Sequence, residues 1–246
     1  SARETRRGRA GYYGNITFID HQIGRLLYEF NKRDPQALRD TLIVFTSDHG
    51  DMMGDHHHWR KTYAYEGSAR IPFIVRYPTS WDMPRGEIVE APIELRDIMP
   101  TMLDAAGVDI PNSVDGQSLL PLARGQRENW RPFVQGEHTS CYTREHGMQY
   151  VTDGREKYIW FHHTGEEQFF DLVSDPGECH NLAANSDQQT RIDRWRQRLA
   201  QINEERGDPR GQNGALVAQP DGALALSPNY NRWKARAEDV ERAWRG

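Results

Sequence analysis

The feature that most restricts the fold is an apolar run from Thr41 to Phe45 (TLIVF) that ends directly in polar residues. Such a run is typical of a strand buried on both faces of a sheet. A second run, at 71–78, is bracketed by prolines. Helical periodicity precedes the first run at 15–30 and follows the second at 94–108, with residues 31–40 as a turn and short linker. This alternation predicts an α/β fold with a mostly parallel sheet.

The pattern changes after about residue 130. Short strand-like runs occupy 132–138, 148–161 and 167–175, and the Asp153-Gly154 pair is a strong hairpin signal. We expect an antiparallel subdomain here.

An amphipathic helix is predicted at 188–206, and its apolar face consists of Ile192, Trp195, Leu199 and Ile202. The residues after it are rich in Gly, Pro and Asn, up to a short helical piece at 233–244. The predicted organisation is therefore an α/β part at 1–130, an antiparallel subdomain with a packing helix at 131–206, and an irregular tail at 207–246.

Composition excludes several classes of protein. Apolar residues make up 37% and charged residues 27%, with a net charge of −5, which fits neither a disordered nor a nucleic-acid-binding chain. No apolar run approaches the ~20 residues of a membrane span, and the first residues lack the apolar core of a secretory signal. Cys141 and Cys179 lack zinc-site spacing. One disulfide between them stays open, but we expect two buried free thiols.

The stretch at 45–61 (FTSDHGDMMGDHHHWRK) concentrates potential ligands behind the first strand. In open α/β sheets, ligands collect beyond the carboxyl ends of strands, which is where Asp48 and His49 stand. A carboxylate suits Ca²⁺ or Mg²⁺, and an imidazole widens the choice to Zn²⁺ or Mn²⁺. Gly50 would let the backbone turn tightly away from a metal. The alternative is that Asp48 caps a turn and the histidines are solvated.

The longer context resembles the sulfatase family of the alkaline phosphatase superfamily. Asp48, His49, Lys61 and the segment Glu66–Pro72 (EGSARIP) match, in order, the sulfatase pattern of a strand ending in two metal ligands, a lysine and E-G-x-x-R-x-P. The resemblance spans roughly residues 10–205. It implies an alkaline-phosphatase-like α/β domain with a C-terminal antiparallel subdomain, hydrolysis of sulfate esters and a periplasmic or secreted location.

The resemblance also implies roles for individual residues. Asp48 and His49 would bind one Ca²⁺, with Mg²⁺, Mn²⁺ or Zn²⁺ less favoured. Lys61 would hold a sulfate or leaving-group oxygen, and His56 would act near the substrate. His57 would contact substrate at the mouth of the pocket, beside His58, although a structural or solvated role competes for both.

Two further residues, Glu66 and Arg70, are expected to form a loop-fixing ion pair rather than to touch substrate.

Sulfatases generate a formylglycine within C/S-x-P/A-x-R, and neither Cys141 nor Cys179 lies in that pattern. The family's Asp-Asp pair of metal carboxylates is also missing before Asp48. The chain is therefore expected to be the C-terminal portion of a sulfatase, inactive without the formylglycine-bearing N-terminal half. Its partners would be that half and a sulfated small molecule or carbohydrate.

Two alternatives remain open. A metal-dependent phosphatase, phosphodiesterase or phosphonate hydrolase of the same superfamily would need more ligands, for which Asp20, His21, Asp51 and Asp55 are available. A non-catalytic fragment could instead bind carbohydrate or another subunit through the aromatic stretch at 158–161, although these residues are more often core.

Overall fold

The structure of the protein, a computed structural model, describes residues 2–139 and 144–220. The chain divides into two compact units whose segments alternate along the sequence. In the described part, the first unit contains residues 2–134, 151–157 and 170–181, and the second contains the remainder. Cys141 and the helical piece expected at 233–244 lie outside the described residues.

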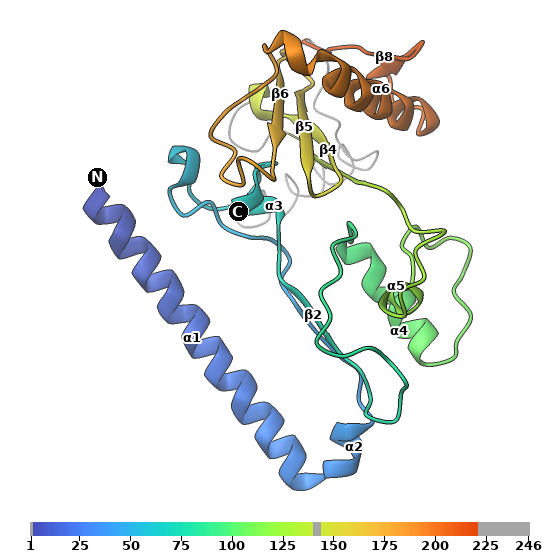
Figure 1. Cartoon of the computed structure of the whole chain (residues 1–246). Helices are drawn as coiled ribbons and strands as arrows, with labels where there is room; N and C mark the ends of the chain where they lie inside the picture. Colours follow the sequence, from blue (N-terminus) through green and yellow to red (C-terminus); the bar gives the residue numbers. More distant parts are fainter. Residues whose placement is uncertain (1, 140–143, 221–246) are drawn as a thin grey trace, which may run out of the picture. The chain divides into compact units, whose positions relative to one another are not determined.

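The chain begins with a long helix, α1 (Ala2–Arg33), which confirms the helical periodicity at 15–30 and extends it toward the N-terminus (Figure 1). None of its residues is buried. A second helix, α2 (Pro35–Arg39), lies where a linker was predicted, so that prediction is wrong. Asp34 caps it by accepting a hydrogen bond from the Ala37 amide at 2.9 Å. Among the described residues, no helix is both long and apolar enough to cross a bilayer.

Two short strands, β1 (Ile43–Thr46) and β2 (Phe73–Arg76), form the first sheet. They pair antiparallel, with Val44 opposite Val75. The parallel pairing expected for them is wrong, because the segment between them contains no long crossover helix that would return the chain to the starting edge. Burial on both faces is also wrong, since Phe45 is 38% and Ile74 60% exposed.

The segment after β2 folds into a short 3₁₀ turn, η2 (Leu95–Asp97), and two helices, α4 (Ile98–Ala105) and α5 (Leu119–Ala123). Helix α4 confirms the helical periodicity at 94–108, and Pro100 lies in its first turn, whereas Met102 is exposed.

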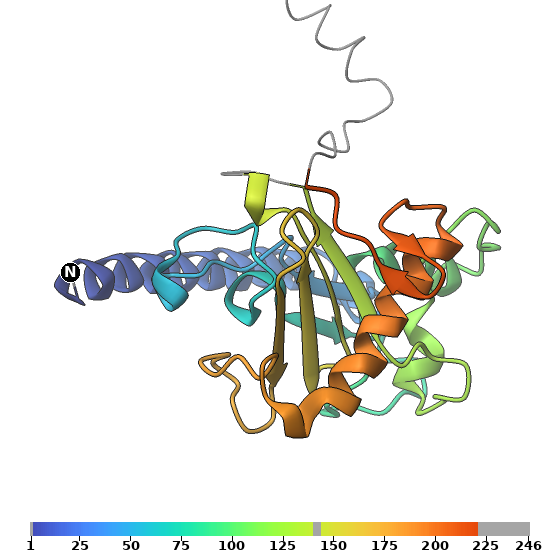
Figure 2. The ribbon, with the colours of Figure 1, turned by 90° about the horizontal axis from the view of Figure 1, so that it is seen from above.

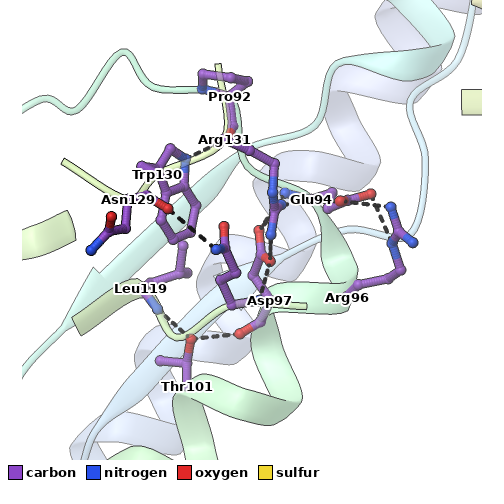
Figure 3. Close-up of polar contacts among 10 residues, drawn as sticks. Pro92, Glu94, Arg96, Asp97, Thr101, Leu119, Asn129, Trp130 and Arg131 are labelled. Carbon is purple, nitrogen blue, oxygen red and sulfur yellow. Dashed lines mark hydrogen bonds and ion pairs between the residues drawn. The ribbon is translucent and has the colours of Figure 1, made fainter. Parts of the chain in front are cut away.

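A buried network fastens these helices (Figure 3). Its centre is Asp97, which is 0% exposed and receives two bonds from the Arg131 guanidinium, at 2.8 and 2.5 Å. The amides of Glu94 and Gln117 also donate to Asp97, each at 2.9 Å. Because all of these donors point at one carboxylate, the network ties η2 to the loop before α5.

Four strands form the second sheet in the order β3 (Val134–His138), β4 (Met148–Thr152), β5 (Glu156–Phe161) and β6 (Glu167–Asp171). The hairpin predicted at Asp153-Gly154 is confirmed, because these residues join neighbouring strands β4 and β5 and Gly154 has a φ of +85°. Asp153 stabilises the turn by accepting the amides of Arg155 and Glu156, each at 2.8 Å. The 3₁₀ turn η3 (Arg144–His146) lies between β3 and β4. The turn between β4 and β5 is too short for a crossover, so these two strands pair antiparallel.

Helix α6 (Gln189–Glu205), drawn in orange in Figure 2, follows the 3₁₀ turn η4 (Ser186–Gln188). Its buried residues confirm the predicted amphipathic helix. Ile192, Trp195 and Leu199 are buried, as are Ala200 and Asn203, whereas Ile202 of the predicted face is not fully buried. Asn203 and Gln149 of β4 exchange two amide hydrogen bonds, at 2.9 and 2.8 Å.

The first described residues after α6, expected to be irregular, include a small antiparallel ladder, β7 (Gly211–Gln212) with β8 (Ala215–Leu216).

Two histidines that follow β5, His162 and His163, contact the segment after this ladder. His163 Nδ1 is 2.9 Å from the Gln219 carbonyl, and the His162 carbonyl accepts the Gln219 amide at 2.8 Å. His162 is buried and its Nε2 has no hydrogen-bond partner within the described residues. Burial lowers the pKa of His162 to about 4.

Candidate functional site

The candidate site begins two residues beyond the end of β1, where Asp48 and His49 leave the strand. The Asp48 side chain is 80% exposed and that of His49 38%. His49 Nδ1 lies 2.7 Å from the carbonyl oxygen of Gly50. A carbonyl can only accept, so we assign the hydrogen to Nδ1, and Nε2 of the neutral ring keeps its lone pair.

Lys61 approaches His49 at that same nitrogen. The Lys61 Nζ atom is 2.9 Å from His49 Nε2, and Asp48 Oδ2 is 3.4 Å from it. The ammonium donates to the imidazole lone pair, while the Asp48 carboxylate supplies a negative charge beside the imidazole. The structure therefore brings Asp48, His49 and Lys61 together, although Lys61 comes from a separate stretch of the loop and is exposed.

The loop that carries Lys61 has an unusual backbone. Five of the seven non-glycine residues with positive φ in the described part of the chain lie within it: Met53, His56, His57, Arg60 and Thr62. Such conformations are uncommon for residues with a Cβ and persist only where surrounding contacts enforce them. One such contact is the Asp51 carboxylate, which accepts the amides of Met53 and Arg60 at 2.9 and 3.1 Å.

Gly50 joins this loop to α3 (Glu66–Ala69). Its amide donates to the Ser68 carbonyl at 2.8 Å, and a Cβ built at Gly50 would lie only 2.1 Å from the Gly67 oxygen. The φ of Gly50 is not in the positive range, so no left-handed conformation requires a glycine at this position. Glycine is needed because the two backbones touch.

His56 makes its contacts with Tyr65 and Gly177 rather than with Asp48, His49 or Lys61. Its ring stacks on Tyr65 with centroids 4.2 Å apart and planes 9° from parallel. Its Nε2 is 3.1 Å from the Gly177 carbonyl. Nε2 thus carries a hydrogen that is donated to this oxygen, and the ring is held on both a face and an edge.

The remaining two histidines differ from each other. His58 stacks on Tyr63 at a centroid distance of 4.1 Å, which gives it a structural contact. His57 is exposed. Within residues 2–139 and 144–220, no hydrogen bond or ion pair links His56 or His57 to Asp48, His49 or Lys61.

Metal-binding capacity rests on Asp48 and His49. In the part of the chain that is described, no group of three or more His, Cys, Asp or Glu side chains is placed to hold a metal ion. The Nδ1 of His49 is held by a backbone carbonyl, as is common in metal-binding histidines, and Nε2 could coordinate a metal once it releases Lys61. The two side chains therefore fit two positions of a divalent cation's shell, which for Ca²⁺ takes ~6–8 ligands.

The ligands required by the two-metal alternative do not gather here. Asp20 and His21 are exposed on α1, Asp51 accepts loop amides, and Asp55 pairs with Arg9 at 2.7 Å.

A buried lysine was not identified from the sequence. Lys157 of β5 is 0% exposed and contacts Glu66 at 2.7 Å and Glu178 at 2.8 Å. The predicted Glu66–Arg70 ion pair is present at 3.6 Å, but the shorter bond of Glu66 goes to Lys157. The expectation of a buried free thiol is wrong for Cys179, which is free but exposed. The expectation for Cys141 falls outside the described residues.

Residues 54–205 match the family model described as N-sulphoglucosamine sulphohydrolase, C-terminal. An arylsulfatase of Clostridium perfringens is 44% identical over 195 residues, covering 79% of this chain and 40% of that protein.

Two solved structures superpose on most of the chain. The phosphonate monoester hydrolase of Agrobacterium radiobacter gives a TM-score of 0.69 at 31% identity, covering 80% of this chain and 41% of that one. BT4656, solved in complex with its substrate D-glucosamine-2-N,6-O-disulfate, gives 0.67 at 28% identity, covering 80% and 40%. The chain thus spans about 40% of the length of the arylsulfatase and of BT4656.

Proposed function

Since the chain belongs to the sulfatase family, matching its C-terminal region over residues 54–205, we propose that it supplies part of an active site that hydrolyses sulfate esters. The family assignment and the alkaline-phosphatase-like α/β fold class are confirmed by these relatives. The observation that carries the proposal is the 2.9 Å approach of Lys61 Nζ to His49 Nε2, beside Asp48.

Asp48 and His49 are the proposed metal ligands, with Ca²⁺ favoured over Mg²⁺, Mn²⁺ or Zn²⁺. A bound divalent cation would neutralise charge on the sulfate oxygens. His49 Nε2 has one lone pair, so its coordination and its bond to Lys61 exclude each other. With Nε2 coordinated, the Lys61 ammonium is available to hold a sulfate or leaving-group oxygen.

His56 and His57 are proposed for the substrate side of the site. His56 offers an Nε2 hydrogen that now goes to the Gly177 carbonyl, and its stacked ring has little freedom to move. His57 is exposed, and its side chain makes no hydrogen bond or ion pair within the described residues, so it can reach a ligand without breaking one. The substrate class is a sulfated small molecule or carbohydrate, and BT4656 with its disulfated glucosamine supports the latter.

The rest of the site is proposed to come from the remaining part of the catalytic domain, including the formylglycine. Two donors cannot complete a Ca²⁺ shell, and the chain covers 40% of the arylsulfatase. Exposed apolar residues on β2 and after it, Ile74 at 60% and Ile88 at 87%, support a covering partner segment. The chain alone is then inactive, and the complete protein is periplasmic or secreted.

The test is turnover of 4-nitrophenyl sulfate by the complete protein, beside two variants. Lys61→Met should lose most of the activity, whereas Lys32→Met, which removes a lysine near the end of α1, should keep it. Equal activity of the two variants would contradict the proposal. So would turnover of the sulfate ester by the 246-residue chain alone.

Phosphonate or phosphate ester hydrolysis is the second candidate, favoured by the similarity to the phosphonate monoester hydrolase. Rates on 4-nitrophenyl sulfate and on 4-nitrophenyl phenylphosphonate, measured on one preparation, separate the two. A preference for the phosphonate by several decades would replace the sulfatase proposal.

A further inference from the structure

The most completely buried charge near the candidate site is Lys157. Its side chain is 0% exposed within strand β5. The ammonium has three hydrogens and three acceptors: the Ala64 carbonyl at 2.7 Å, Glu66 Oε1 at 2.7 Å and Glu178 Oε1 at 2.8 Å. A lysine this deeply buried is uncommon unless it is paired, so its position depends on these acceptors.

The two carboxylates also hold the start of α3. The Glu66 amide, at the first residue of α3, donates to Glu178 Oε2 at 2.6 Å. The other oxygen of Glu178 receives Lys157. Removal of the ammonium would leave Glu66 and Glu178 facing each other with their negative charges uncompensated by Lys157.

Helix α3 in turn contacts both sides of the candidate site. Its Ser68 carbonyl receives the amide of Gly50, the neighbour of His49. Its Ser68 hydroxyl lies 3.4 Å from the amide of Tyr63, two residues beyond Lys61. A shift of α3 therefore moves the chain next to each partner of the His49–Lys61 contact.

We propose that Lys157 is a positioning residue: through Glu66, Glu178 and Ala64 it fixes α3 and so sets the approach of Lys61 to His49. In this proposal Lys157 acts on the His49–Lys61 contact through α3. The consequence for catalysis rests on the proposed sulfatase function, but the effect on the His49 imidazole does not.

The test uses the complete protein with ¹⁵N-labelled histidine. The spectra are recorded with a chelator and without Ca²⁺, because a coordinated His49 Nε2 cannot also accept from Lys61. The His49 Nε2 resonance is assigned with His49→Asn, and Lys61→Met gives its position without the ammonium contact. Lys157→Met is combined with Glu178→Gln, so that one buried carboxylate is removed with the ammonium and the variant is more readily folded. Lys157→Arg tests whether a cation of different shape restores the contact.

The matched control is Asp97→Asn with Arg131→Met, which removes a buried ion pair in the same unit without contact to α3. The Lys157 double variant should shift the His49 Nε2 resonance toward that of Lys61→Met and lower kcat for 4-nitrophenyl sulfate on the order of 100-fold. The control should unfold at lower temperature but keep the wild-type resonance. Lys157→Arg should lie between wild type and the double variant.

A folded Lys157 double variant with the wild-type His49 resonance would overturn the proposal. An equal resonance shift in the Asp97–Arg131 control would also overturn it, because the effect would then reflect general loss of stability. If wild type has no sulfatase activity, the sulfatase function fails, while the resonance shift still decides the role of Lys157.

Discussion

Replacement of Arg131 by Met should strongly destabilise the first unit, because it strands a fully buried carboxylate (Figure 3). Asp97 would lose its two guanidinium bonds, at 2.8 and 2.5 Å, and keep only the amides of Glu94 and Gln117. Breaking a buried ion pair by removing one partner costs about 3–5 kcal/mol. Asp97 is 0% and the Arg131 side chain 16% exposed, so solvent offers little compensation.

The assay is urea unfolding followed by tryptophan fluorescence. Trp130 reports locally, since its Nε1 donates to the Pro92 carbonyl at 2.9 Å and its ring lies 4.9 Å from the Arg131 guanidinium carbon. The control is Arg96→Met, which removes an arginine that is 54% exposed and paired with Glu94 at 2.8 Å. An exposed pair is worth about 0–1 kcal/mol.

The double variant, Asp97→Asn with Arg131→Met, should be less destabilised than the two single losses added together, because no charge remains unpaired. A loss for Arg131→Met no larger than that for Arg96→Met would refute the reasoning. It would mean that Asp97 is satisfied by its backbone donors alone.

Three further predictions follow from the site and its surroundings. Gly50→Ala should lower both the thermal midpoint and the Ca²⁺ affinity of the complete protein, because the new Cβ would lie 2.1 Å from the Gly67 oxygen. If calorimetry and Ca²⁺ titration show no change in either quantity, the close contact at Gly50 is refuted. Burial lowers the pKa of His162 from 6.5 to about 4, so the folded state favours its neutral form. The free energy of unfolding should therefore be highest above pH 6.5 and fall by on the order of 3 kcal/mol as the pH drops toward 4. His162→Phe should flatten that pH dependence in urea titrations, and an unaltered slope would exclude His162 as its source. Lys61→Met should lower kcat/KM for 4-nitrophenyl sulfate by about 100-fold or more, against little change in Lys32→Met.

Much of the local structure could be predicted because its signals are local. The apolar stripe of α6 and the Asp153-Gly154 turn each depend on residues within a few positions of one another. The helix α2 was missed although its signals are present, since Asp34 is an N-cap residue and Pro35 occupies the first helical position. The order Asp48, His49, Lys61 indicated the site through a family resemblance, and folding brings these three side chains together.

The remaining features depend on contacts between distant parts of the sequence. Gly50 has its role because the backbone of Gly67 lies against it, which no pattern around residue 50 reveals. Lys157 is buried because Glu66 and Glu178 converge on it from either side in the sequence. His56 is drawn into stacking on Tyr65, whereas the sequence offered only a row of three similar histidines. The antiparallel course of β2 was likewise set by the path of the loop between the strands.

The most direct test of the proposed site is a crystal structure of the complete protein grown with Ca²⁺ and inorganic sulfate. Asp48 and His49 should both coordinate one cation, with the Asp48 oxygen at about 2.3–2.6 Å, and the Lys61 ammonium should contact a sulfate oxygen at that cation. A cation bound without Asp48 and His49, or a sulfate bound at the cation with Lys61 turned away, would contradict the site as proposed.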